Sequence, residues 1–105
     1  MKKVTAGRDI LGEFASKFAE INDDILFGEV WAREDKLPTK IRSIVTISAL
    51  ISGENIEQLS YYLEKGKENG ITKEEISEII THIAFYVGWP KAWSAFTKAK
   101  EIYKD

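Results

Sequence analysis

Apolar residues recur at helical spacing along the whole chain, rather than at the alternating spacing of strands. The pattern predicts six helices with short connections, over residues 9–21, 24–33, 38–52, 55–68, 72–87 and 90–103. Several stop and start signals agree with these bounds: Asn69-Gly70 favours a left-handed stop, Thr72 and Glu75 form a capping-box pattern, and Pro90 suits a first turn. We therefore expect an all-α fold in a single domain over residues 1–105.

Two other helix starts are predicted from polar residues that can accept hydrogen bonds from first-turn amides. Asp9 is the expected N-cap of the first helix. Asn55, with Gln58 three residues later, resembles a capping box and is expected to open the fourth helix.

The segment over residues 38–52 differs from the others because no charged residue follows Arg42 within it. A helix that is apolar on every side must be covered on every side. Five other short helices can hardly achieve this alone, so we infer a subunit interface. The alternative is a monomeric bundle with this helix at its centre.

Composition and charge exclude several classes of protein. The 15 basic residues balance 17 acidic ones and give a net charge of −2, which argues against a nucleic-acid binder. The basic residues are scattered, and those near the C-terminus (Lys98, Lys100 and Lys104) are interleaved with Glu101 and Asp105. No apolar run approaches the roughly 20 residues of a membrane span, and no signal-peptide pattern is present, so we expect a cytoplasmic protein without membrane contact.

Cysteine is absent and His82 is the single histidine. Disulfides, thiolate chemistry and multi-histidine metal sites are therefore excluded, and no metal is expected. His82 has Tyr86 four residues later on the same helical face, which suggests a functional pair. The alternative is a structural histidine satisfied within the core.

Arg42 stands where the apolar helix begins, and a guanidinium there needs a carboxylate partner. That partner is either an intrachain carboxylate, Glu29 or Glu34, or the carboxylate of a substrate. Arg33 is a weaker candidate of the same kind. Trp31 is most simply a core or interface residue.

Four stretches of the sequence resemble the carboxymuconolactone decarboxylase family, which includes the alkylhydroperoxidase-type proteins. They cover residues 27–33, 42–50, 70–76 and 81–92. The last is the most specific, because residues 82–90 carry the family pattern His-x-x-x-Tyr-x-Gly-x-Pro. The resemblance implies the six-helix fold of that family and a ring-like homo-oligomer, a trimer or a hexamer.

The peroxidase-type members of this family carry a Cys-x-x-Cys pair, a histidine and a glutamate. The two cysteines correspond to Asn55 and Gln58 here, the histidine to Tyr62 and the glutamate to Ser43. All four positions differ from the peroxidase-type pattern. Dithiol peroxidase activity is therefore excluded. Tyr62 also replaces a histidine that is usual in decarboxylase-type members.

The sequence is more similar to the cysteine-free decarboxylase branch, which implies a carboxy-lyase or isomerase without a cofactor that acts on a small carboxylated lactone. By this resemblance, Arg42 and Arg33 would hold substrate carboxylates and His82 would donate the proton, since histidine titrates near neutral pH. Glu29 and Tyr86 would orient these groups.

Trp31 and Tyr62 complete the expected substrate-binding set. The alternative is a non-catalytic oligomeric binding or scaffold protein, favoured by Tyr62 and by the missing cysteines.

Overall fold

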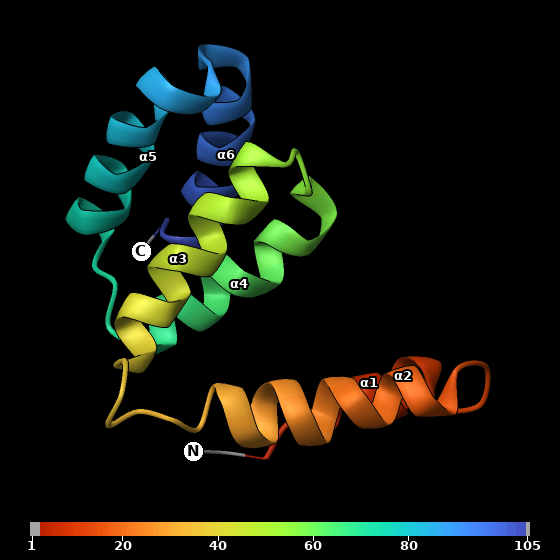
Figure 1. Ribbon diagram of the computed structural model, residues 1–105. Helices are drawn as coiled ribbons and strands as arrows, with labels where there is room; N and C mark the ends of the chain where they lie inside the picture. The colour runs from red at the N-terminus through yellow and green to blue at the C-terminus, as the bar shows by residue number, and fades with distance from the viewer. Residues whose placement is uncertain (1–2, 105) are drawn as a thin grey trace. The chain divides into compact units, whose positions relative to one another are not determined.

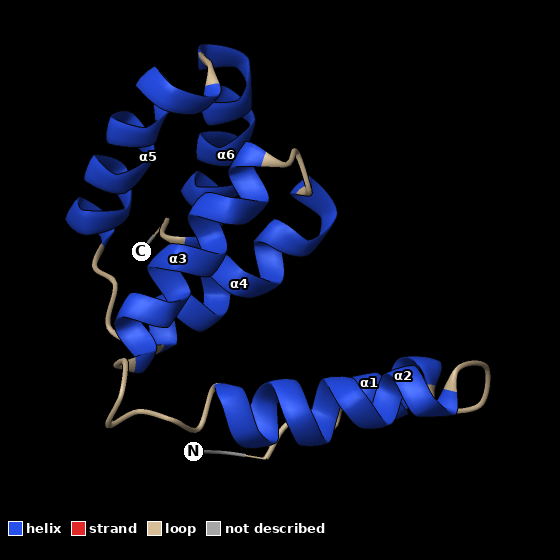
Figure 2. Cartoon of the chain, viewed as in Figure 1, coloured by secondary structure: helices blue, strands red, loops and turns tan. Residues whose placement is uncertain are grey.

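A computed structural model describes residues 3–104, which form six α-helices and one π-helical segment without any strand (Figures 1 and 2). The all-α prediction is therefore confirmed. The chain divides into two compact units, residues 1–39 and residues 40–105. Within the described part of the chain, no helix combines the length and the apolarity needed to cross a membrane.

The first unit is a helical hairpin. Its first arm is α1 (Ala6–Leu11), which packs against a second arm formed by α2 (Ser16–Glu20) and the π-helical segment η1 (Ile21–Val30). The buried carboxylate of Asp23 joins the arms by accepting hydrogen bonds from the backbone N–H groups of Gly7 (2.8 Å) and Arg8 (3.0 Å). Glycine is needed at position 7, because a Cβ there would lie 2.7 Å from Asp23 Oδ1 and 2.9 Å from the Ala19 carbonyl oxygen.

This hairpin corrects the first two predicted helices. The continuous helix over residues 9–21 is wrong, because the chain turns over residues 12–15 to fold α1 back on the second arm. Asp9 is not the N-cap. Thr5 holds that position, and its hydroxyl donates to Asp9 Oδ2 over 3.0 Å. The predicted break between residues 21 and 24 is also wrong, because the second arm is continuous there and Asp23 faces α1.

The second unit is a bundle of α3 (Thr39–Ser52), α4 (Ile56–Glu68), α5 (Lys73–Val87) and α6 (Trp89–Ile102). Figure 1 shows α3 and α5 running in the same general direction, and α4 and α6 running in the opposite direction. Its core consists of buried apolar residues from all four helices, chiefly Ile47, Ile51, Leu59, Leu63, Ile71, Ile76, Ile80, Ala84, Ala92, Ala95, Ala99 and Tyr103.

Most predicted helix ends in this unit are confirmed. Thr72 Oγ1 accepts from the Glu75 backbone N–H and Glu75 Oε1 accepts from the Thr72 N–H, which completes the capping box. Gly70 has a φ of 100°, as a left-handed stop requires, and Pro90 lies in the first turn of α6. The predicted box at Asn55 is wrong, because its side chain makes no capping hydrogen bond although it is the N-cap residue of α4.

The end of α6 is fastened to the turn between α4 and α5. The Tyr103 hydroxyl donates to the Ile71 carbonyl oxygen over 2.9 Å inside the core. Lys67 Nζ lies 5.5 Å from the centre of the Tyr103 ring and donates to the Ile102 carbonyl oxygen. The last helix is thereby fixed against α4 and α5.

Large apolar side chains nevertheless remain exposed on the second unit. Val45 on α3 is 58 % exposed, and Phe85, Trp89 and Trp93 on α5 and α6 are 59–78 % exposed. Phe85 and Trp89 meet edge to face with 6.2 Å between ring centres. Exposed apolar groups of this kind can form an interaction surface, but the subunit interface and the ring stay predictions.

Candidate functional site

His82 lies on the exposed side of α5, where its ring lies beside that of Tyr86 at an angle of 36°, with the ring centres 5.3 Å apart. Among the described residues, His82 has neither a hydrogen bond nor an ion pair. The interpretation as a satisfied core histidine is therefore wrong for the single chain. The predicted neighbour relation between His82 and Tyr86 is confirmed.

Arg42 is half-buried on the first turns of α3, and its carbonyl oxygen accepts a hydrogen bond from the Thr46 hydroxyl. Two residues earlier, Lys40 pairs with Glu75 of α5 over 2.9 Å, so this flank of α3 faces α5. Successive helical residues are rotated by about 100°, which turns Arg42 about 200° away from Lys40. Arg42 therefore points away from α5.

His82 follows Glu75 by seven residues, or about two turns, and shares its face of α5. Backbone donation from Thr72, followed by the contact with Lys40, keeps the pKa of Glu75 below its usual range. Glu75 is therefore ionised when it pairs with Lys40 of α3. His82 shares this flank of α5, whereas helix rotation turns Arg42 to the side of α3 opposite Lys40.

Tyr62 is half-buried on α4, where it packs against the core and meets the edge of the Tyr61 ring at 5.0 Å between centres. Burial, and secondarily Tyr61, raises the pKa of Tyr62 above its ordinary value. The phenol is therefore neutral at physiological pH. It can donate a hydrogen bond but is a poor proton-transfer group.

The other predicted site residues lie in the first unit. Glu29 is exposed near the end of η1, and Arg33 is exposed in the turn that follows. Trp31 is buried and stacks on Phe27 with 5.9 Å between ring centres. Their predicted role in substrate binding stays a prediction.

Of the positions that carry the dithiol machinery in peroxidase-type members, Ser43 has a structural contact here. Ser43 is fully buried and accepts a hydrogen bond from Asn69 Nδ2 over 3.0 Å, which joins α3 to the end of α4. Gln58 is exposed on the first turn of α4. Over the described residues, no cluster of three or more metal-binding side chains is present.

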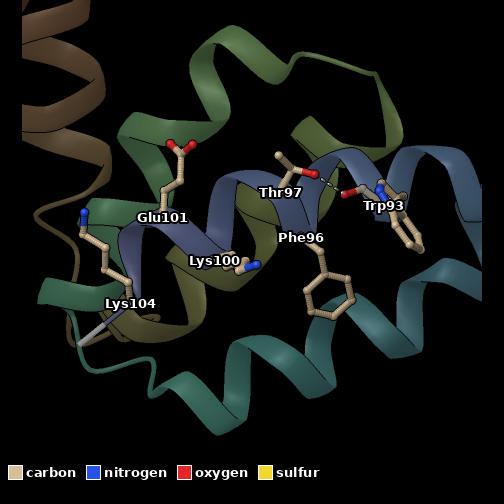
Figure 3. Close-up of a pocket in the computed structure, with 6 residues that line it drawn as sticks. All are labelled: Trp93, Phe96, Thr97, Lys100, Glu101 and Lys104. Carbon is tan, nitrogen blue, oxygen red and sulfur yellow. Dashed lines mark hydrogen bonds between the residues drawn. The ribbon is translucent and has the colours of Figure 1, made fainter.

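Sequence reasoning missed a lysine-lined surface along α6. A cavity of about 660 Å³ lies along α6. Figure 3 shows the residues that line it, with Trp93 at one end and Lys104 at the other. A second cavity of about 440 Å³ lies beside it, against α5, and shares Phe96, Lys100 and Lys104. These three residues are spaced four positions apart, which places them on one face of the helix. The spacing could have predicted this surface, but the acidic residues between the lysines made the basic face hard to see in the sequence.

Comparison with known proteins gives a consistent result. The profile of the carboxymuconolactone decarboxylase family matches residues 16–101. A 4-carboxymuconolactone decarboxylase of Acinetobacter baylyi is 35 % identical over 104 residues, which cover 99 % of this chain and 77 % of that protein. A nitrosuccinic acid decarboxylase of Metarhizium robertsii is 29 % identical over 86 residues, which cover 82 % of this chain and 59 % of that protein.

Proposed function

Because the chain belongs to the carboxymuconolactone decarboxylase family, we propose that it is a cofactor-independent carboxy-lyase for a small carboxylated lactone or a related acid. Both relatives named above are decarboxylases, which supports a decarboxylase-like protein. The observation that carries the proposal furthest is His82, an exposed imidazole that no hydrogen bond within the described chain occupies.

The proposed reaction needs no group beyond the side chains. The C–C bond to the substrate carboxylate breaks, CO₂ leaves, and the electron pair moves into the conjugated lactone carbonyl. The resulting dienolate is then protonated on carbon. The protein must hold the carboxylate, stabilise the charge on the oxygen and supply one proton.

His82 is the proposed proton donor, with Tyr86 holding its ring in place from one turn away. Glu29 is assigned to orienting these groups. Arg42 is the proposed carboxylate clamp, with Arg33 as a second cation, since a guanidinium can bind a carboxylate through two parallel hydrogen bonds. Trp31 and Tyr62 are assigned to the pocket wall.

We propose that one site takes its arginine from one copy of the chain and its histidine from another. Helix rotation supports this, because it turns Arg42 to the side of α3 opposite Lys40, which pairs with the flank of α5 that carries His82. This is the proposed role of the homo-oligomeric ring, a trimer or a hexamer.

The test is CO₂ release from 4-carboxymuconolactone by the wild type and by His82→Gln and Arg42→Met. Loss of a general acid is expected to lower turnover by about 10²-fold or more, with an unchanged oligomer by size-exclusion chromatography. Thr81→Ala, at the exposed neighbouring position, is the control and should retain activity. Unchanged turnover in both variants would overturn the site. No release by an intact wild-type oligomer would favour the non-catalytic alternative.

A further inference from the structure

The cavity of about 440 Å³ between the first half of α5 and the second half of α6, here called the lysine groove, has an apolar floor. Ile76, Ala99 and Tyr103 contribute to that floor. Figure 3 shows Phe96 pointing from α6 towards α5, and Phe96 also lines the larger cavity that continues along α6 to Trp93. An apolar surface therefore extends from the groove along the helix.

Cations surround this floor. Lys73, Lys100 and Lys104 line the groove, whereas no acidic side chain does. None of the three lysines has a hydrogen bond or ion pair with another described residue. Glu101 lines only the neighbouring cavity. Because the chain as a whole carries a net charge of −2, this cationic groove is a local feature.

We propose that the lysine groove binds a small amphipathic carboxylate, an organic acid with an apolar body and one anionic end. The floor accepts the body, and the lysines hold the carboxylate. A neutral ligand would leave three cations uncompensated. An apolar face of a second copy would bury the same cations without partners, at a large desolvation cost.

This site is separate from the proposed catalytic residues. Nine residues separate Lys73 from His82, which corresponds to about half a turn of net rotation on α5. The groove therefore opens on the opposite side of α5 from His82. The inference goes beyond the decarboxylase proposal and does not depend on it.

The test is a titration of the full-length protein with sodium octanoate, followed by backbone amide NMR shifts, with neutral octanamide as the matched ligand. Octanoate is expected to shift Phe96, Lys100 and Lys104 saturably. Each of Lys100→Gln and Lys104→Gln is expected to weaken binding by about twofold to fivefold, as for exposed ion pairs. Lys98→Gln, on the same helix but outside the cavity lining, is the control and should bind as the wild type does.

Three results would overturn the proposal. One is the absence of saturable octanoate shifts at the groove. Another is equal binding of octanoate and octanamide, since the lysines would then contribute nothing. The third is a protein-concentration dependence of the same shifts without ligand, which would mean that a second copy covers the groove.

Discussion

Tyr103→Phe removes one oxygen atom from the core of the second unit. The lost bond is the donation from the Tyr103 hydroxyl to the Ile71 carbonyl oxygen, 2.9 Å long, from a side chain that is only 5 % exposed. A buried hydrogen bond contributes about 1 kcal/mol net, and a buried acceptor left without a partner costs about 1–3 kcal/mol. We expect the free energy of unfolding to fall by about 1–3 kcal/mol, and Tm to fall by about 4–8 °C for each kcal/mol.

The assay is urea unfolding followed by circular dichroism, at one protomer concentration for all variants because association stabilises folded chains. Tyr86→Phe is the matched control, since Tyr86 is 78 % exposed and its hydroxyl has no hydrogen-bond partner among the described residues. It should change the free energy of unfolding by less than about 0.5 kcal/mol. Equal effects of the two substitutions would mean that the Tyr103–Ile71 hydrogen bond does not stabilise the core.

The same tyrosine predicts a loss of stability at alkaline pH. Burial, followed by the charges of Glu64 and Glu75, raises the pKa of Tyr103 above its ordinary value. Above a pH of about 10 the unfolded chain releases the phenol proton while the folded chain retains it, so stability falls as the pH rises. Tyr103→Phe should remove this part of the pH dependence, and an unchanged alkaline slope in the variant would contradict it.

Three further predictions concern contacts inside the first unit and inside the second. Gly7→Ala should detach α1, because the new Cβ would meet the Ala19 carbonyl oxygen at 2.9 Å, and faster amide exchange in α1 would report this. Hydrogen bonds from Asn22 and from the Arg8 and Gly7 amides outweigh burial and hold the pKa of Asp23 below its usual range. The stabilisation of the folded state by ionised Asp23 is therefore complete above a pH of about 4 and is lost as the pH falls through the lowered pKa. Weaker protection of the Arg8 amide against hydrogen exchange in acid would report the loss. Leu63→Ala should lower the free energy of unfolding by about 2–5 kcal/mol in the same urea assay, because this core residue is fully buried.

The sequence was most informative where one local interaction decides the structure. Gly70 follows the end of α4 with the left-handed backbone of a stop, the capping box at Thr72 starts α5, and both were predictable from residue type alone. The first unit was mispredicted because Asp23 has the residue type of a turn. In the structure it is buried against α1, where its carboxylate binds the amide of Gly7, 16 residues earlier in the sequence. No local pattern carries that information.

The candidate site shows the same limit. The pairing of His82 with Tyr86 follows from their four-residue spacing, and the structure contains it. Which flank of α3 meets α5, and with it the position of Arg42 relative to His82, depends on tertiary contacts such as the Lys40–Glu75 ion pair. The lysine groove combines Lys73 with Lys100, 27 positions apart, so tertiary structure alone assembles it.

The most direct test of the account is CO₂ release from 4-carboxymuconolactone by mixed oligomers, assembled from equal amounts of the inactive His82→Gln and Arg42→Met chains. If each site takes its arginine and its histidine from different copies, random assembly restores both residues in about one quarter of the sites. We expect the mixture to recover about this fraction of wild-type turnover. A mixture no more active than the separate variants would place both residues in one chain and contradict the two-copy site. A wild type that releases no CO₂ would contradict the proposed decarboxylation itself.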